Sequence, residues 1–474
     1  MDYLLADIMC RYLKSTGRDV RLQIGADEHG SKIFNKAAEA GIPVQEFVDA
    51  NWKKFKEFID LLCKDYTDIV RTTDPDHIRR VQEIWRKLDE AGHIYKGTYE
   101  GWYCEGCEGF VTQKEYDETN GVCPDHQKPY VKLSEENYYL NIAEFRDQLT
   151  ADIQNDKIKI IPESRKREFL NTLADMPDVS ISRPTKSLTW GVPVPEDDSQ
   201  VMYVWVDALS NYVTVLGYPE NDIAEWWPAY AQIIGKDILR FHAGIWQVML
   251  YGLDMPTSPI ILTHGHITLN GEKMSKSLGN VVGPKEIMDK YGVEAFRYYF
   301  SRHVSTTDDS DFSWEKMHNA YNNELKNDLG NLVQRLATMC NKYISSAEAP
   351  VLQQSATTGS GASEACNDGS ERSADANLRF SELMDSMHYS DAVDLLWEDI
   401  QQLNRDIDES KPWTVARTDL NGAEKIVIDL ATRLIDTARL LAPFLPETSE
   451  KILKIFTAGQ ITPPETPLFP PIEA

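Results

Sequence analysis

The hydrophobic pattern predicts two strand–loop–helix units in the first 262 residues. Apolar and polar residues alternate from Val20 to Ile24, as in a half-buried strand, and helical spacing follows from about Ser31 to Ala40. The second unit begins at residues 231–237, where a predicted strand ends at Gly235 and a helix runs on to Gly252. Strands and helices in this order are typical of a doubly wound α/β fold with a parallel sheet.

The rest of the chain has a different pattern. From about residue 319 onward, apolar residues recur at helical spacing, for example at Leu325, Leu329 and Leu332. A bundle of antiparallel helices is the simplest packing for such a segment. Residues 350–376 are rich in Ser, Ala and Gly and have almost no large apolar side chains, so we expect a disordered connection there.

Cysteines between the two α/β units have the spacing of metal ligands. Two pairs, Cys104 with Cys107 and Cys123 with His126, are separated by fifteen residues. Each pair makes a tight turn that aims two ligands at one ion, and a Cys₃His set leaves no coordination position open. The pattern predicts one structural Zn²⁺ per chain, and the alternative is a chance cluster of reduced thiols.

Composition and charge narrow the class of protein. The chain has 474 residues, 42% hydrophobic and 26% charged, which is ordinary for a soluble protein of several domains. No apolar run reaches membrane-spanning length, and Asp2 stands where a signal peptide needs a positive charge, so we expect a cytoplasmic protein without membrane contact. The 49 basic and 75 acidic residues give a net charge of −26, which argues against nucleic-acid binding through global charge but allows a local basic path.

One pentapeptide, Lys273-Met274-Ser275-Lys276-Ser277, suits a loop that closes on a polyphosphate. Its two ammonium groups can meet charge that develops on departing oxygens, and the glycines at 271 and 279 permit the backbone to move. Spacing alone favours an ordinary solvated loop. The string, however, closely resembles the signature loop of class I aminoacyl-tRNA synthetases, in its bacterial methionyl-tRNA synthetase version.

The resemblance extends over nearly the whole chain and implies an architecture. This is a class I Rossmann-like doubly wound parallel sheet with a zinc-knuckle connective insertion, followed by an all-α anticodon-binding helix bundle. The implied segments are residues 1–97 and 201–262 for the two halves of the catalytic domain and 98–200 for the insertion. Residues 263–318 would carry the signature loop and contact the tRNA stem, and 319–474 would form the bundle.

The resemblance also implies site residues, position by position. Asp27, in the string Gly-Ala-Asp-Glu-His-Gly, suits the α-ammonium group of an amino acid, and Arg183 matches an arginine near the amino-acid and ATP sites. Without the resemblance, Asp27 would be interpreted as part of a solvated turn, and the aromatic candidates as ordinary core. Apolar and aromatic residues that suit a thioether are expected to form the methionine pocket: Trp205, Ala208, Tyr212, Ile238 and His242. The expected ATP-binding residues are Lys273, Ser275, Lys276, Gly235, Asp237 and His264.

Three residues of the bundle are candidates for reading the anticodon. Asn331 and Arg335 lie at i and i+4 on one predicted helix face, and Trp413 follows a proline. An aromatic platform beside amide and guanidinium donors fits splayed single-stranded bases. The resemblance implies that these residues read the methionine anticodon, whereas Asn331 and Arg335 alone would indicate only an exposed helix face.

The implied reaction joins methionine to tRNA(Met) for translation initiation and elongation. The methionine carboxylate attacks the α-phosphate of ATP and expels pyrophosphate, and a terminal hydroxyl of the tRNA then takes the methionyl group. Lys276 and Lys273 are the expected catalytic residues, with Mg²⁺ accompanying ATP. Positioning and charge stabilisation, rather than covalent chemistry, would carry the rate.

One part of the family pattern is missing from the sequence. The His-x-Gly-His motif, which in the family precedes the segment matched by residues 4–7, is absent, together with the first strand. We therefore expect the chain as written to activate methionine poorly or not at all. Two alternatives stay open, a truncated non-catalytic tRNA-binding relative and another class I synthetase. The chain ends at Ala474 without an appended oligonucleotide-binding domain, which favours a monomer.

Overall fold

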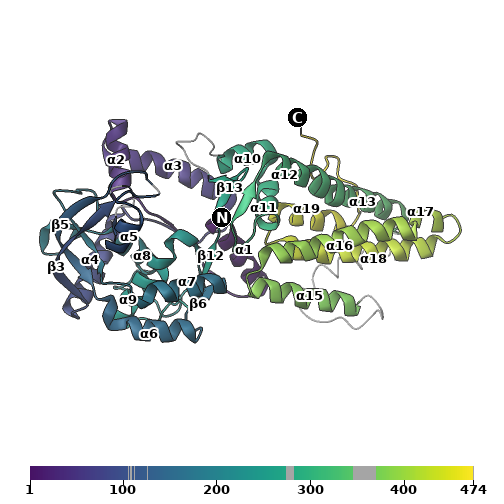
Figure 1. Cartoon of the computed structure of the whole chain (residues 1–474). Helices are drawn as coiled ribbons and strands as arrows, with labels where there is room; N and C mark the ends of the chain where they lie inside the picture. Colours follow the sequence, from purple (N-terminus) through teal and green to yellow (C-terminus); the bar gives the residue numbers. More distant parts are fainter. Residues whose placement is uncertain are drawn as a thin grey trace. The chain divides into compact units, whose positions relative to one another are not determined.

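The computed structural model describes residues 1–472 except 105, 107, 108, 112, 125, 274–281 and 345–369. Its chain divides into two compact units, drawn in Figure 1. The first, the helical unit, comprises Met1–Val20, Leu61–Cys63 and His264–Ala474. The second, the α/β unit, comprises Arg21–Asp60 and Lys64–Thr263. Among the described residues no helix is long and apolar enough to cross a membrane.

Two small sheets of the α/β unit hold its parallel strands. Strand β1 (Gln23–Ala26) pairs in parallel with β2 (Asp68–Arg71), with Gly25 opposite Val70. Strand β12 (Ile260–His264) lies between β11 (Gln232–Gly235) and β6 (Lys159–Ile161), and it is parallel to β6. The predicted strands therefore form, although β1 begins three residues after Val20, where the alternating pattern starts.

Helices cover these strands because each has one apolar face. Helix α2 (Ser31–Ala40) has the predicted bounds and ends at Gly41 in the left-handed conformation, with φ of 69°. Helix α4 (Pro75–Glu90) buries Val81, Trp85 and Leu88 at helical spacing. It packs on α8 (Val204–Thr214), which contributes Val206, Leu209 and Val213 to the same core.

The helix predicted between Gly235 and Gly252 is not continuous. A 3₁₀ turn (Lys236–Ile238) follows β11, then a π-helix (Phe241–Ile245), and only then α9 (Trp246–Gly252). The buried Gln247 explains part of this break, because its amide binds the carbonyl of His242 at 2.8 Å and the N–H of Ser258 at 3.0 Å. Such π-turns are frequent at functional sites.

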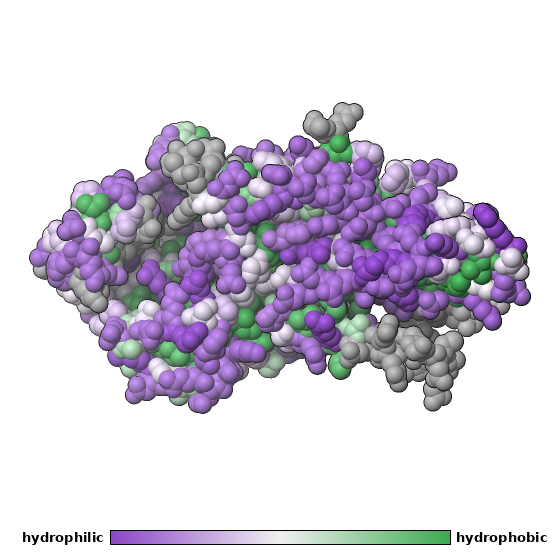
Figure 2. Space-filling model, turned by 45° about the vertical axis from the view of Figure 1, so that its right-hand side comes forward, coloured by the Kyte–Doolittle hydropathy of each residue, from purple (hydrophilic) through white to green (hydrophobic). Residues whose placement is uncertain are grey.

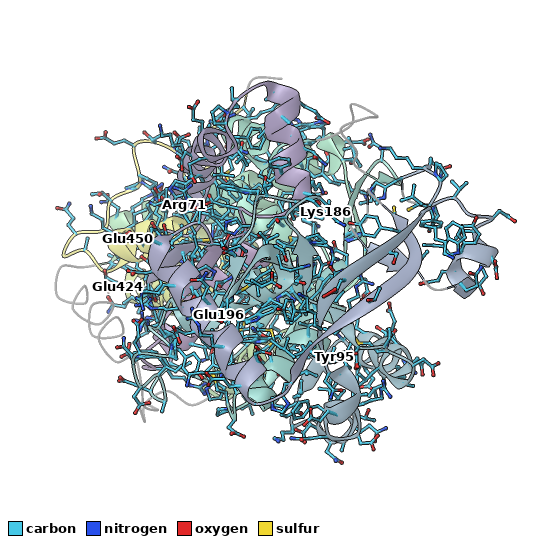
Figure 3. The ribbon with its side chains drawn as sticks, turned by 90° about the vertical axis from the view of Figure 1, so that its left-hand side faces the viewer. Arg71, Tyr95, Lys186, Glu196, Glu424 and Glu450 are labelled. Atoms are coloured by element: carbon cyan, nitrogen blue, oxygen red, sulfur yellow. The ribbon has the colours of Figure 1, made fainter. Side chains whose placement is uncertain are left out.

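The insertion is built on a long antiparallel hairpin. Strands β3 (Ile94–Cys104) and β5 (Val131–Leu140) pair over their length, flanked by β4 (Gly109–Val111) and β7 (Val179–Ser180). A second sheet joins β8 (Ser182–Pro184), β10 (Asp197–Met202) and β9 (Pro193–Val194). Tyr95 of β3, which is labelled in Figure 3, stacks on Tyr139 at 5.6 Å and donates to Asp178 at 2.8 Å. Helices α5 (Gln113–Glu118), α6 (Ile142–Gln154) and α7 (Glu163–Ala174) complete this region.

The helical unit begins with α1 (Asp2–Ser15) and resumes after Thr263. Its small sheet has the order β14 (Glu272–Lys273), β13 (Ile267–Leu269), β15 (Ser310–Phe312). Helices α10 (Pro284–Tyr291), α11 (Val293–Arg302) and α12 (Trp314–Asn319) follow, and a π-helix (Ala320–Gly330) leads into α13 (Asn331–Tyr343).

The predicted bundle forms around α18 (Leu420–Leu441). This helix contacts α13, α16 (Tyr389–Ser410), α17 (Pro412–Val415) and α19 (Pro446–Phe456) (Figure 1). Helix α15 (Ser370–Asp385) begins inside the stretch expected to be disordered. The end of this stretch has few large apolar residues, but Glu371, Ala374 and Ala376 are good helix formers. Residues 350–369 of that stretch lie outside the described residues.

One buried cation connects distant segments of the helical unit. Arg297 of α11 is 1% exposed and donates to the carbonyls of Phe444 at 2.8 Å, Pro443 at 2.7 Å and Leu62 at 2.8 Å. Leu62 is the last residue of α3 (Val44–Leu62). Arg297 also pairs with Asp7 of α1 at 2.7 Å. Arg297 is buried, whereas the surface residues on the face drawn in Figure 2 are mostly hydrophilic.

Candidate functional site

The loop after β1 presents one exposed acid that is followed by two buried residues. Asp27 is exposed, whereas Glu28 and His29 are 5% and 6% exposed. Glu28 is fixed on several sides, since its N–H donates to Thr72 at 3.0 Å and its carbonyl accepts from the Trp190 indole at 2.7 Å. The loop stands at the carboxyl end of a parallel strand, which is where ligands bind in open α/β sheets.

Aromatic side chains from two elements meet beside α8. Trp205 of α8 stacks on Phe241 of the π-helix with ring centroids 4.0 Å apart and meets His242 edge-on at 6.1 Å. Tyr212, seven residues along α8 from Trp205 and thus on the same face, lies 5.8 Å from the His242 ring and 5.9 Å from Trp246. The structure therefore brings together Trp205, Tyr212 and His242 as the sequence predicts.

Hydrogen bonds fix the tautomer of His242. Its Nδ1 lies 3.0 Å from the carbonyl oxygen of Ile238, which can only accept, so Nδ1 carries a proton. Its Nε2 lies 3.0 Å from the Tyr212 hydroxyl. In the neutral ring Nε2 is therefore the acceptor and Tyr212 the donor. The Tyr212–His242 pair is thus a polar contact among otherwise apolar and aromatic side chains.

The other predicted residues of the α/β unit lie on neighbouring elements. Ala208 is buried on the same face of α8 as Trp205. Gly235 ends β11, and Asp237 and Ile238 follow in the 3₁₀ turn, with Asp237 exposed. Arg183 of β8 is 8% exposed, and its guanidinium lies 4.5 Å from the ring centroid of Tyr203, the residue before α8.

The predicted ATP residues of the helical unit are only partly described. His264 lies in a short contact with Asp2, and although burial opposes ionisation, the hydrogen bond and charge of His264 lower the pKa of Asp2 to about 2. Lys273 ends β14. Ser275 and Lys276 lie outside the described residues.

The bundle places the three anticodon candidates at one end. Asn331 and Arg335 lie on α13, as predicted, and the guanidinium of Arg335 pairs at 2.5 Å with Asp408 in the last turn of α16. Trp413 follows that helix by a few residues and is 40% exposed. The sequence did not predict the Arg335–Asp408 pair, because nothing local connects these positions.

Three of the four predicted metal ligands meet at the end of the hairpin where β3 is connected to β5. The ligand atoms of Cys104, Cys123 and His126 lie within 4.8 Å of one another. The two sulfurs are 3.9 and 3.6 Å from Nδ1 of His126. Cys107 lies outside the described residues. A side chain on Gly106 would come within 2.3 Å of the His126 ring, so the turn needs glycine there.

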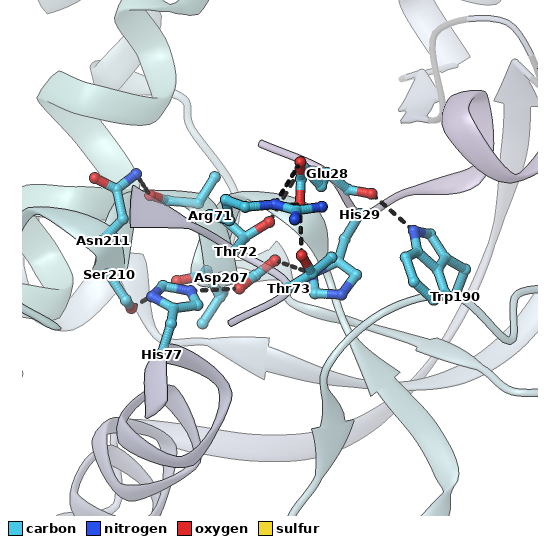
Figure 4. A network of polar contacts seen from close by, with 12 residues as sticks. Glu28, His29, Arg71, Thr72, Thr73, His77, Trp190, Asp207, Ser210 and Asn211 are labelled. Atoms are coloured by element: carbon cyan, nitrogen blue, oxygen red, sulfur yellow. Dashed lines mark hydrogen bonds and ion pairs between the residues drawn. The ribbon is translucent and has the colours of Figure 1, made fainter. Parts of the chain in front are cut away.

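A buried network that the sequence did not reveal lies behind the predicted site. Asp207 of α8, 1% exposed, accepts from His29 at 2.7 Å and from His77 of α4 at 2.8 Å (Figure 4). Arg71 of β2 pairs with Glu28 at 2.9 Å and with Asp49 at 2.5 Å. The available signal was a single acid, Asp207, in an otherwise apolar run of the sequence from Val204 to Ala208.

Comparison with known proteins agrees with this geometry. The family model described as tRNA synthetases class I (M) matches residues 1–132 and 125–337. The methionine–tRNA ligase of Caldanaerobacter subterraneus is 39% identical over 95% of this chain and 69% of its own length. That of Streptomyces coelicolor is 38% identical over 94% of this chain and 84% of its own. A structure of the Mycobacterium tuberculosis methionyl-tRNA synthetase with methionyl-adenylate has a TM-score of 0.87 at 30% identity, covering 99% of this chain and 96% of that one.

The fold and the site define a class I aminoacyl-tRNA synthetase, with a Rossmann-like unit and a helical C-terminal part. Within that class, the chain belongs to the methionine–tRNA ligases. Its function is the ATP-dependent ligation of methionine to tRNA. The alternative of a synthetase for another amino acid is thereby excluded.

Proposed function

We propose that the α/β unit binds methionine between the Asp27 loop and the aromatic wall of α8. The observation that carries this proposal is the Tyr212–His242 hydrogen bond of 3.0 Å beside Trp205. A thioether sulfur is polarisable and attracted to aromatic edges. A phenol–imidazole pair near the sulfur adds a polar contact that modestly favours methionine over a plain alkyl side chain. Asp27 binds the α-ammonium group. Ala208 and Ile238 complete the pocket, and Arg183 lies at its side.

Activation of methionine requires ATP next to this pocket. Gly235, which ends β11, and Asp237 of the following turn hold the ribose. In the helical unit, His264 is the proposed contact of the adenine. Lys273, Ser275 and Lys276 meet the phosphates, where the ammonium groups neutralise charge that develops as pyrophosphate leaves. Mg²⁺ bound with ATP supplies further neutralisation of phosphate charge. The methionyl group then passes from the adenylate to a terminal hydroxyl of tRNA(Met), and AMP leaves.

The bundle reads the anticodon through Asn331, Arg335 and Trp413. Trp413 offers an exposed ring for stacking, and Arg335 offers donors to a base edge. In the free protein Arg335 is paired with Asp408. This acid therefore competes with the nucleic acid for the guanidinium and disfavours unspecific phosphate contacts. The enzyme acts as a monomer on this proposal.

Cys104, Cys107, Cys123 and His126 hold a structural Zn²⁺. The convergence of two thiols and an imidazole nitrogen fits the tetrahedral preference of this ion. The buried cluster around the thiols is small, with Tyr130 buried and Trp102 stacked on Tyr116 at 3.9 Å. A metal would supply the stability that so small a core lacks.

The methionine pocket is tested with Tyr212→Phe. Removing the hydroxyl should weaken methionine binding about threefold to tenfold, because a single hydrogen-bonding group in an apolar pocket discriminates only modestly. Binding of norleucine, which has a methylene in place of sulfur, should change less. The measurement is isothermal titration calorimetry with each amino acid.

The matched control for this test is Tyr95→Phe, which removes a hydroxyl on the hairpin. Its methionine affinity should equal that of the unmodified enzyme. Equal affinities for methionine in the Tyr212→Phe and Tyr95→Phe variants would refute the placement of the pocket.

A further inference from the structure

The buried carboxylate of Asp207 joins two segments far apart in sequence. Its Oδ2 accepts from Nδ1 of His29 at 2.7 Å, and its Oδ1 accepts from Nε2 of His77 at 2.8 Å. The other nitrogen of His77 lies 2.7 Å from the hydroxyl of Thr214. All four side chains are buried, and Figure 4 shows the two imidazole rings on either side of the carboxylate.

Apart from its core residues Val206, Leu209 and Val213, helix α8 has two faces with different contacts. Trp205, Ala208 and Tyr212 recur at helical spacing on the face that meets the π-helix. The opposite set consists of Asp207, Asn211 and Thr214, again at helical spacing. Asp207 and Thr214 bind His77, and Asn211 accepts from Gln23 of β1 at 2.7 Å. We call these the pocket face and the anchor face.

The other end of the network is the loop that carries Asp27. His29 follows Asp27 by two residues and packs against Trp190 with ring centroids 5.2 Å apart. Arg71 holds Glu28 from the side of β2 at 2.9 Å. Asp27 is thus an exposed residue in a loop whose next two side chains are both fixed.

We propose that Asp207 is a positioning residue that sets the spacing between the Asp27 carboxylate and the pocket face of α8, and thereby the length of amino acid that the enzyme accepts. One carboxylate fixes both the loop through His29 and the helix that carries Trp205 and Tyr212. The proposal rests on the roles proposed above for Asp27 and the pocket. It adds a determinant of substrate length that touches no substrate.

The charge state of the network makes this spacing dependent on pH. Burial alone would lower the pKa of His29, but the hydrogen bond and charge of Asp207 raise it above the ordinary 6.5, helped by Asp27 and Glu28. Burial would raise the pKa of Asp207, but the two histidines hold it below its ordinary value. The titratable and charged groups around His29 are Asp207 from α8, His77 from α4, Arg71 from β2 through Glu28, and Asp27 and Glu28 from its own loop.

The sign of the pH effect follows from the raised pKa of His29. Below about pH 6.5 the His29 imidazole is charged in the folded and the unfolded chain, and the His29–Asp207 pair contributes its full stabilisation to the fold of the network. As the pH rises through the raised pKa of the folded state, that contribution is lost. Methionine affinity should therefore weaken on the alkaline side.

The test is Asp207→Asn, which keeps the shape of the side chain and removes its charge. The Kd for methionine should rise about tenfold, in line with the loss of charged hydrogen bonds. The preference for methionine over ethionine, which is one methylene longer, should narrow at least about threefold. In the pH profile of methionine affinity, the alkaline limb, where affinity falls as the pH rises, should move to lower pH. A merely structural role would lower the melting temperature without moving this limb.

Two further variants keep the outcome decisive. Asp152→Asn makes the same chemical change in the α/β unit, where Asp152 accepts from Tyr251 at 2.7 Å, and should leave affinity, selectivity and pH profile unchanged. If Asp207→Asn does not fold, His77→Gln removes one of the two histidine contacts of Asp207. It should change methionine affinity, selectivity and the pH profile in the same directions, by smaller amounts. Unchanged selectivity and an unchanged alkaline limb in a folded variant would overturn the proposal.

Failure of this proposal is distinguishable from failure of the proposed methionine site. If Tyr212→Phe and Asp27→Asn weaken methionine binding while Asp207→Asn does not, only the positioning role is wrong. If none of the three changes binding, the site itself is misplaced.

Discussion

His242 shows how neighbouring atoms decide the chemistry of a single residue. The carbonyl of Ile238 engages its Nδ1 proton, so the neutral ring can only accept from Tyr212. The sequence predicted these residue types in one pocket through a family resemblance. It did not predict the direction of the hydrogen bond, which depends on the backbone carbonyl of Ile238 at the end of the 3₁₀ turn.

Gly106 provides a test of the metal site at the same scale. A Cβ at this position would lie 2.3 Å from the His126 ring, so Gly106→Ala should displace that ligand. Zinc content, measured by atomic emission after gel filtration, should fall from about one per chain to well below half.

The control for this prediction is Gly97→Ala on the same hairpin. Its Cβ would meet Tyr139 at 3.4 Å, an ordinary contact. Full zinc occupancy in Gly106→Ala would mean that His126 is not a ligand.

The residues that sequence reasoning missed share one property. Asp207, His29 and His77 make no local pattern, since they come from a helix, a loop and another helix and meet only in the fold. Asp27 and Trp205 were predicted as site residues because they lie in motifs of the family. A buried polar network has no periodicity, so burial and pairing must be seen before it can be recognised.

Elements of regular amphipathic pattern were well predicted, and irregular ones were not. Helix α2 has its predicted bounds, and the bundle helices follow from apolar spacing. The segment from Gly235 to Gly252 satisfied the helical pattern but folds as three short pieces. The deciding contacts are those of Gln247, whose buried amide holds one backbone acceptor and one backbone donor.

Gln247→Met tests the role of this amide. The change keeps volume but leaves the carbonyl of His242 and the N–H of Ser258 buried without this partner. We expect a decrease of about 2–4 kcal/mol in the free energy of unfolding of the α/β unit, measured by urea denaturation. Methionine binding should weaken as well, since His242 lies in the π-helix.

A partly buried glutamine with a hydrogen bond at the surface serves as the control. Gln82→Met removes a hydrogen bond to the carbonyl of Pro193 at the surface, and its cost should stay within about 0.5 kcal/mol. A similar small cost in Gln247→Met would show that the π-turn forms without the amide.

At the scale of the whole molecule, charge is distributed very unevenly between surface and interior. The net charge is −26, yet a buried arginine, Arg297, connects α1, the end of α3 and the segment after α18. The sequence predicted the bundle but not this link, because residues 7, 62, 297 and 443 are related only through tertiary structure.

Arg297→Met should therefore destabilise the helical unit by about 3–5 kcal/mol, because it leaves Asp7 and three carbonyls without their buried partner. Arg297→Lys keeps the charge but offers fewer donors, and it should cost less. Far-UV circular dichroism during urea unfolding measures both.

Arg405→Met is the surface counterpart, since Arg405 binds only its neighbour Gln402 among the hydrogen bonds described. It should change stability by less than about 0.5 kcal/mol. Equal effects of the two arginine-to-methionine changes would contradict a central role for Arg297.

The two faces of helix α8 have a consequence for how this enzyme can change. Substitutions at 205, 208 and 212 alter what fits beside the helix, whereas 207, 211 and 214 keep the helix in place. Mutations on the pocket face can therefore change which amino acid the enzyme accepts as substrate, while the anchor face keeps the contacts that hold the helix. Libraries restricted to the pocket face vary the residues beside the substrate and leave the hydrogen bonds of the anchor face unchanged.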